Sequence, residues 1–343
     1  MRKIRLGRTE LMVSAVGFGG IPIQRLSQQE AIDVVRHCLD LGITFLDTAN
    51  GYTTSEERIG KAIAGRREDL VLATKTQARD AQGVTEHLAL SLKRLGVGSI
   101  DLYQFHCVST DEEYERVVAP GGPLDVVRDA QRAGKVGHIG LTSHSMDIAL
   151  RAVRSSLFQT IMFPFNFIAN EAAQELIPLA VEGNVGFIAM KPLAGGALDN
   201  APLAFKYLRQ FPEILPIPGI ERPEEIDEIL DIVEGPAEMT SEDLAEMERM
   251  RVELGNRFCR RCGYCQPCPQ GVSIQLLMIL DSMIKRMPVT EVFRDFAQIV
   301  EQANDCVECG ECKEKCPFDL PIPEIIKEHV DLFHREMVKA GLD

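Results

Sequence analysis

The sequence predicts a (β/α)8 barrel followed by a smaller, helix-rich domain. Two observations favour this fold class. Over the first two thirds of the chain, short apolar runs alternate with longer segments of helical periodicity, which is typical of parallel strands joined by helices. The last third carries two closely spaced runs of four cysteines. We therefore expect a barrel over residues 1–240 and a second domain over residues 241–343.

The composition is that of a globular protein. The chain has 343 residues, 45% of them hydrophobic and 26% charged, and this length suits one large domain plus a small one. Its net charge of −14 argues against nucleic acid or an anionic membrane surface as a partner. No stretch approaches the ~20 apolar residues of a membrane span, and the start MRKIRLGRTE has no signal-peptide core. We expect a cytoplasmic protein.

The barrel begins with a short hairpin, which we predict from Arg2–Arg5 and Met12–Val16 around the turn at residues 6–9. Eight strand-like runs follow, and the first of them overlaps the hairpin. They are Val13–Phe18, Thr44–Asp47, Leu70–Thr74, Ile100–Phe105, His138–Leu141, Thr160–Phe165, Val185–Met190 and Ile214–Ile217. Eight such units suit the roughly 250 residues of a (β/α)8, or TIM, barrel.

Segments with helical periodicity separate these strands, among them Gln28–Leu41, Ser55–Ile63 and Val84–Leu95. We interpret Val108–Pro123, with its acidic DEEYE and its APGGP, as a loop that shapes a pocket. A doubly wound open sheet is the competing architecture. It is disfavoured because no G-x-G-x-x-G follows the first strand.

Polar side chains follow five successive strands at the point where each strand ends. They are Asp47, Lys75, His106, Ser143 and Asn166. Barrel enzymes carry their chemistry at this carboxyl-terminal rim. A buried strand end is a costly place for Asp, Lys or His without a partner or a task. One such residue alone would be structural, but five on successive strands indicate an active site.

The two cysteine runs are the most specific motif. The first is Cys259, Cys262, Cys265 and Cys268 before Pro269, and the second is Cys306, Cys309, Cys312 and Cys316 before Pro317. The second run is the C-x2-C-x2-C-x3-C-P pattern of bacterial ferredoxins. Eight such cysteines imply two [4Fe–4S] clusters. Disulfides are disfavoured in a cytosolic setting, and two zinc sites of four cysteines remain the alternative.

In two-cluster ferredoxins the fourth cysteine of each run serves the other cluster. This resemblance implies two crossed groups of ligands, Cys259, Cys262, Cys265 and Cys316 on one side and Cys268, Cys306, Cys309 and Cys312 on the other. The first run departs from the ferredoxin pattern by one residue before its last cysteine.

Helical patterns surround the cysteines. They cover Ser241–Glu253, Ile274–Met287, Val289–Gln302 and Pro323–Ala340. The tail is therefore richer in helix than a compact bacterial ferredoxin. We expect its apolar faces to pack on the barrel, with a partner-binding face as the alternative.

A family resemblance adds to this interpretation. Asp47-Thr48-Ala49-Asn50-Gly51-Tyr52, followed by Ser55-Glu56, resembles the D-T-A-x-x-Y…S-E signature of the aldo-keto reductases. LVLATK, IDLYQFH, GHIGLTSHS, KPLAGG and PIPGIERPEEID look like further landmarks of that family. The resemblance covers about residues 1–233, and the cysteine tail matches the subgroup with a C-terminal ferredoxin-like extension.

This resemblance implies a catalytic tetrad of Asp47, Tyr52, Lys75 and His106. Carbonyl reduction needs a hydride for carbon and a proton for the developing alkoxide. A tyrosine with a pKa of about 10 is a poor acid unless a neighbouring cation stabilises its phenolate. Lys75 would supply that charge and Asp47 would hold the lysine, while His106 would orient the carbonyl oxygen. In reverse, Tyr52 would be the general base.

The resemblance also implies NADP(H), with contacts at Gly19, Ser143, Asn166, Gly219 and Arg222. Several family positions differ here, because His144, Met162 and Met190 stand where an asparagine, a glutamine and an aromatic residue are usual, and Gly219 stands where a lysine is usual. Arg222 is equally well explained as a solvated charge opposing Glu224 and Glu225.

Three functions fit these observations. The first, which we favour, is an NADP(H)-dependent oxidoreductase that interconverts a carbonyl and an alcohol and carries two [4Fe–4S] clusters for electron transfer or structure. In the second, the clusters couple the barrel to a ferredoxin or another subunit without free nicotinamide. The third is an electron carrier with an inactive barrel, which the complete tetrad argues against.

Overall fold

The computed structural model describes residues 1–342, which form two compact units, Met1–Met239 and the segment from Thr240 onward. Among the described residues, no helix is long and apolar enough to cross a membrane.

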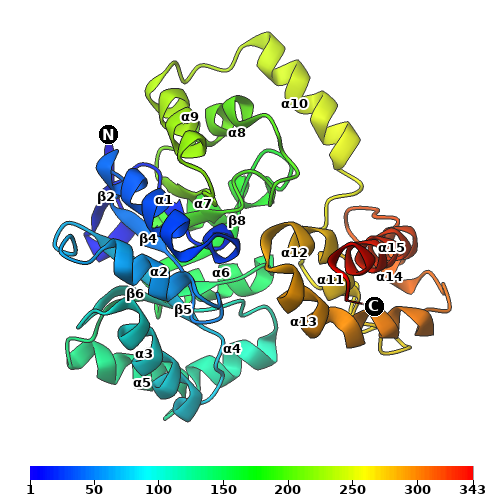
Figure 1. The fold of residues 1–343 in the computed structure, drawn as a ribbon, viewed down its shortest axis with the longest axis horizontal. Coiled ribbons are helices and arrows are strands. Elements are labelled where there is room, and N and C mark those ends of the chain that lie inside the picture. Colours follow the sequence, from blue (N-terminus) through cyan, green and yellow to red (C-terminus); the bar gives the residue numbers. More distant parts are fainter. Residues whose placement is uncertain (343) are drawn as a thin grey trace. The chain divides into compact units, whose positions relative to one another are not determined.

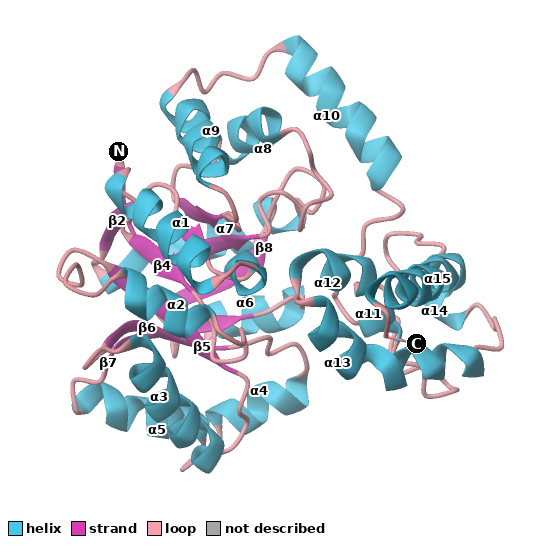
Figure 2. Cartoon of the chain, viewed as in Figure 1, coloured by secondary structure: helices cyan, strands magenta, loops and turns pink. Residues whose placement is uncertain are grey.

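The first unit is a barrel of eight parallel strands, which confirms the predicted fold class (Figures 1 and 2). The strands are β3 (Phe18–Gly19), β4 (Phe45–Asp47), β5 (Val71–Thr76), β6 (Ile100–Phe105), β7 (Val136–Thr142), β8 (Thr160–Pro164), β9 (Gly186–Met190) and β10 (Ile214–Ile217). Each pairs with the next in chain order. Gly17 N–H and Gly19 N–H donate to Pro216 O and Pro218 O at 2.9 and 2.7 Å, which joins β3 to β10.

Helices follow the strands and surround them (Figure 2). They are α1 (Gln28–Asp40), α2 (Ser55–Ala62), α3 (Ala81–Leu95), α4 (Asp111–Val118), α5 (Pro123–Arg132), α6 (Met146–Arg154), α7 (Leu176–Glu182), α8 (Ala201–Leu208) and α9 (Pro223–Glu234). Short 3-10 turns occupy Gly7–Thr9, Pro22–Arg25 and Glu171–Ala173. Local sequence sets these starts, as at α1, where Ser27 and Glu30 form a capping box.

The predicted first strand, Val13–Phe18, is wrong in its bounds. The predicted hairpin is confirmed as antiparallel β1 (Lys3–Arg5) and β2 (Met12–Ser14), and the barrel strand β3 begins only at Phe18. Val13 pairs with Ile4 in the hairpin, and both side chains pack against the apolar residues of the barrel interior. One continuous apolar run therefore supplies two elements with different partners.

The prediction of a loop over Val108–Pro123 is also wrong, because this segment contains helix α4. Thr110 accepts from Glu113 N–H at 3.2 Å, and the Glu113 carboxylate accepts from Thr110 N–H at 3.3 Å. This capping box starts the helix. Tyr114 and Val117 are then buried in the barrel's outer core.

The second unit contains α10 (Ser241–Leu254), α11 (Ile274–Leu277), α12 (Leu280–Arg286), α13 (Val289–Glu301), α14 (Glu311–Glu314) and α15 (Ile322–Ala340), with a 3-10 turn at Gln302–Asp305. The predicted helix Ile274–Met287 is broken into α11 and α12. The break falls at Ile279, whose φ of −114° and ψ of 5° lie outside the helical region, while Leu277 and Leu280 on either side are buried in the same core.

The tail has an apolar core of its own. Its buried members include Leu277, Val292, Phe296, Ile325 and Phe333. Phe293 and Phe333 stack edge to face with ring centroids 4.9 Å apart. The apolar faces of α11, α12, α13 and α15 are thus buried against one another, and packing of the tail on the barrel stays a prediction.

Candidate active site and cluster sites

An ion pair at the carboxyl-terminal rim joins the strands β4 and β5. Lys75 Nζ donates to Asp47 Oδ2 at 2.6 Å and to Thr48 O at 2.6 Å. The two charged side chains are 1% and 4% exposed. Because a buried lysine is stable only with a partner, the pair fixes the ammonium at one place in the rim.

Gln104 is a further member of this group that the sequence analysis missed. It lies opposite Lys75 in the β5–β6 register and is fully buried. Its Nε2 donates to Asp47 Oδ1 at 3.3 Å, so both carboxylate oxygens of Asp47 have donors. A glutamine between apolar neighbours in IDLYQF was the available signal.

Tyr52 lies in the loop that follows β4, and local hydrogen bonds hold this loop. Tyr52 N–H donates to Ala49 O at 2.9 Å and Ser55 N–H donates to Tyr52 O at 2.7 Å. Thr48 Oγ1 donates to Ser55 Oγ at 2.9 Å. The loop is therefore tied to the start of α2.

These contacts bring the four residues of the predicted tetrad together. Lys75 Nζ lies 5.0 Å from the centre of the Tyr52 ring. The rings of Tyr52 and His106 meet edge to face with centroids 5.7 Å apart. His106 follows β6 and is 9% exposed. A cation, a phenol and an imidazole thus share one small region of the rim.

The electrostatics keep Lys75 protonated. Burial alone would lower the pKa of Lys75, but Asp47 and Tyr52 outweigh that effect and raise it. For Asp47, burial raises the carboxyl pKa, and the attraction of Lys75 and the bond from Gln104 oppose that rise. The site therefore holds a fixed positive charge beside the tyrosine.

Ser143 and Asn166, the other polar strand ends, are buried and bonded locally. Ser143 Oγ donates to Ser145 O at 3.1 Å and accepts from Ser145 N–H at 3.0 Å. Asn166 Oδ1 accepts from two backbone N–H groups of the next turn at 2.9 Å each, while its Nδ2 donates to Lys191 O at 3.0 Å. Both side chains shape the loops in which they lie.

Gly19 and Gly219 face each other in a parallel bridge where the barrel closes. A Cβ on Gly19 would lie 2.7 Å from Pro218 O, and one on Gly219 would lie 2.7 Å from the Pro22 ring. Both positions need glycine for close packing. Arg222 precedes α9, is 72% exposed and pairs with Glu225 at 3.1 Å.

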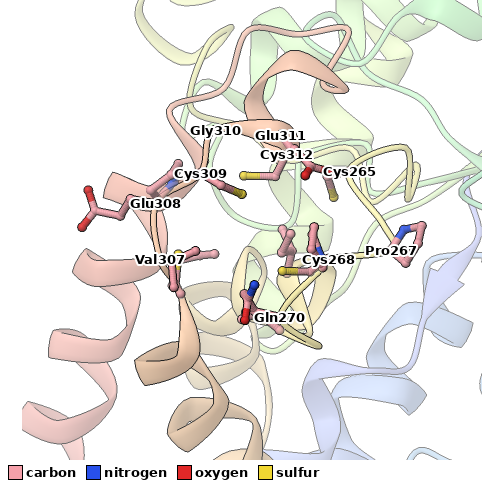
Figure 3. A pocket seen from close by; sticks show the side chains of 16 residues that line it. Cys265, Pro267, Cys268, Gln270, Val307, Glu308, Cys309, Gly310, Glu311 and Cys312 are labelled. Carbon is pink, nitrogen blue, oxygen red and sulfur yellow. The ribbon is translucent and has the colours of Figure 1, made fainter.

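In the second unit, the cysteines line two hollows. One is lined by Cys265, Cys268, Cys306, Cys309 and Cys312. Figure 3 shows Cys268, Cys309 and Cys312 around it. The other is lined by Cys259, Cys262, Cys265 and Cys316. Each hollow thus combines cysteines from both runs, and Cys265 lines both hollows.

The chemistry of these hollows fits an iron–sulfur cluster in each. Cysteine thiols of both runs line each space, and all ten cysteines of the chain are free of disulfides. Burial first, and then the neighbouring Cys259 and Cys262, raise the pKa of the Cys265 thiol to about 12. Buried thiolates side by side repel one another, so a cationic iron centre is what would hold them together.

The two units define the class of the protein, a (β/α)8-barrel oxidoreductase extended by an iron–sulfur domain. The model of the Aldo/keto reductase family matches residues 15–203, which is more than half of the chain. The chain belongs to the aldo/keto reductase family. A second match, to the 4Fe-4S dicluster domain, covers residues 258–321, and this favours clusters over zinc.

Two relatives match about three fifths of the chain. The uncharacterized oxidoreductase YqkF of Bacillus subtilis is 29% identical over 217 residues, which are 59% of this chain and 68% of that protein. The aldo-keto reductase yakc [NADP(+)] of Schizosaccharomyces pombe is 30% identical over 224 residues, 59% of this chain and 63% of that protein. The chain thus spans about two thirds of the length of these relatives.

A solved structure resembles the same part of the chain. The aldo-keto reductase AKR11C1 from Bacillus halodurans superposes with a TM-score of 0.64, over 73% of this chain and 96% of that one, at 23% identity. This likeness shows the barrel fold.

Proposed function

We propose that the barrel interconverts a carbonyl and an alcohol on a small molecule by hydride transfer with NADP(H), and that Tyr52 is its general acid and base. The observation that carries this proposal is the buried Lys75–Asp47 pair beside the Tyr52 ring. The cysteines of the tail would hold two [4Fe–4S] clusters, for electron transfer or for structure.

The arrangement suits proton transfer to a developing alkoxide. The Lys75 ammonium stabilises the Tyr52 phenolate that remains when the hydroxyl gives up its proton. Asp47 and Gln104 keep the lysine in place. His106, whose ring meets the Tyr52 ring, would donate to the substrate oxygen and fix its direction. In oxidation, Tyr52 takes the proton back.

A bound nicotinamide would supply the hydride. Support for NADP(H) comes from the family and from the name of the fission-yeast relative. Arg222 stays a predicted partner of phosphate, and in this structure its exposed guanidinium pairs with Glu225 at the start of α9. Gly19, Ser143, Asn166 and Gly219 stay predicted contacts, and at these positions only the backbone or a locally bonded side chain is offered.

One observation favours a second candidate function. The side chains of Ser143 and Asn166 are engaged in their own loops, and Gly219 has no side chain where a lysine would meet phosphate. Weak nicotinamide contacts suit a barrel that exchanges electrons through the clusters with a ferredoxin or another redox protein.

For both candidate functions we propose that the protein works in the cytoplasm, where thiols stay reduced.

An anaerobic titration separates the two candidates. NADPH, then NADH, is added to iron-loaded protein while the cluster absorbance and the nicotinamide fluorescence are followed. Binding and turnover of a probe aldehyde such as 4-nitrobenzaldehyde would support the first function, and loss of turnover with retained binding in Tyr52→Phe would assign the proton donor. Absence of nicotinamide binding would overturn the first function. Bleached clusters would show that electrons reach them from nicotinamide.

A further inference from the structure

We propose that Arg79 is a positioning residue, which sets the orientation of His106 by holding the backbone turn that carries it. This proposal rests on the function proposed above, since it concerns the same rim. Arg79 lies between β5, which carries Lys75, and α3. It therefore connects the strand of the lysine to the loop of the histidine.

The guanidinium of Arg79 binds this turn directly. Its Nη2 donates to His106 O at 2.7 Å and to Cys107 O at 3.2 Å, and it pairs with Glu113 Oε1 at 3.3 Å. Nη1 donates to Gln77 O at 3.0 Å. The side chain is 15% exposed, so these charge-assisted bonds are little weakened by water.

The turn itself has an unfavourable backbone. Cys107 has a φ of +54°, a region that a residue with a Cβ adopts only when its surroundings enforce it. The neighbouring strands bind the two backbone N–H groups of this turn. His106 N–H donates to Thr76 O at 2.8 Å, and Cys107 N–H donates to Thr142 Oγ1 at 2.8 Å. Arg79 binds the two carbonyl groups.

The same arginine also joins the turn to helix α4. Glu113, its carboxylate partner, accepts from Ser109 N–H at 2.8 Å and belongs to the capping box with Thr110. One planar guanidinium thus holds carbonyl groups on two loops and a carboxylate on a helix. A lysine at this position has a single point of attachment and cannot span them.

The opposite end of the same two strands offers a matched control. Arg67 precedes β5 and donates to Leu70 O at 2.6 Å, to Ser99 O at 3.3 Å and to Asp101 Oδ2 at 2.6 Å. Its side chain is 28% exposed. Arg67 therefore makes the same kind of bridge between β5 and β6, but at the amino-terminal end of the barrel.

The test compares Arg79→Ala, Arg79→Lys and Arg67→Ala in the iron-loaded full chain, with NADPH and 4-nitrobenzaldehyde as probes. We expect kcat to fall about 10- to 100-fold in Arg79→Ala, with KM for NADPH unchanged within about twofold. Guanidinium ion should restore part of kcat in this variant. Arg67→Ala should lower the melting temperature and leave kcat within about twofold. An unchanged kcat in Arg79→Ala, or an equal loss in Arg67→Ala, would overturn the proposal.

A measurement that needs no turnover keeps this proposal separate from the proposed function. The ring signals of 13C-labelled histidine are recorded across pH, and His106→Gln assigns the signal of His106. We expect Arg79→Ala to shift that signal and Arg67→Ala to leave it in place. An unmoved signal in both would overturn the positioning role even if the wild type reduces no aldehyde. If Arg79→Ala does not fold, Arg79→Lys carries both comparisons.

Discussion

At the scale of single residues, the Lys75–Asp47 pair makes the site costly to alter. Both side chains are almost fully buried, so removing one charge leaves the other without compensation. We expect Lys75→Met to lower the free energy of unfolding of the barrel by ~3–5 kcal/mol, and the further change Asp47→Leu to recover much of that loss. Urea unfolding followed by tyrosine fluorescence measures both. A double variant no more stable than Lys75→Met would contradict this account.

The pH dependence of stability follows from the same lysine. Its pKa is raised in the folded barrel, above the value of about 10.4 in an unfolded chain. The stabilising contribution is therefore complete below pH ~10.4, and it is lost as the pH rises through the folded pKa. The melting temperature of the wild type minus that of the double variant Lys75→Met with Asp47→Leu, which lacks both charges, should be constant from pH 7 to about pH 10 and then shrink. A difference that grows with pH would refute the assignment.

At the scale of elements, close packing of two helices requires a glycine at one position. Gly60 lies in α2, and a Cβ there would come within 2.6 Å of Leu95 O at the end of α3. Alanine favours a helix by ~1 kcal/mol over glycine, but overpacking against rigid backbone costs ~1–3 kcal/mol. We therefore expect Gly60→Ala to destabilise the barrel in urea. Gly98→Ala, with open space around it, should be neutral or slightly stabilising, and equal effects at both positions would contradict the packing argument.

The bounds of a strand could be predicted where all residues of an apolar run pack within the same part of the structure. The strand Ile100–Phe105 and the strand Ile214–Ile217 have the predicted bounds. The bounds of the first barrel strand were predicted wrongly because Val13 pairs within the hairpin, whereas Phe18 pairs with β4 in the barrel. Helix α4 was missed because the capping pair Thr110 and Glu113 carries little apolar signal. Periodicity reports burial, but not which element provides the partner.

The candidate site was predictable to a similar extent. Asp47, Lys75 and His106 could be found because charged or polar residues at buried strand ends are rare. Gln104 offered a weaker signal, as an uncharged polar residue inside an apolar strand, and Arg79 offered none, because an arginine in a loop looks ordinary until the fold shows which atoms it meets. The position of a charged residue at a strand end indicates a reactive group. The residues that support it depend on how the loops fold, which the sequence pattern does not show.

At the scale of the whole molecule, the second unit unites sequence segments that are far apart. Its two hollows each combine cysteines from both runs, and residues 274–301 between the runs form helices of the tail's own core. If each hollow holds one cluster, neither run can complete a cluster without the other. The clusters would then also act as cross-links between the two ends of the domain.

Paired substitutions test this crossed arrangement. Cys259 and Cys316 line one hollow, so Cys259→Ser with Cys316→Ser should remove one cluster and leave about half of the iron. Cys306 lines the other hollow, and therefore Cys306→Ser with Cys316→Ser should damage both clusters, although both residues belong to the second run. Iron content and the electron paramagnetic resonance of the reduced protein report the number of clusters. The reverse result, with the first pair losing all iron and the second pair losing half, would mean that each run binds a cluster by itself.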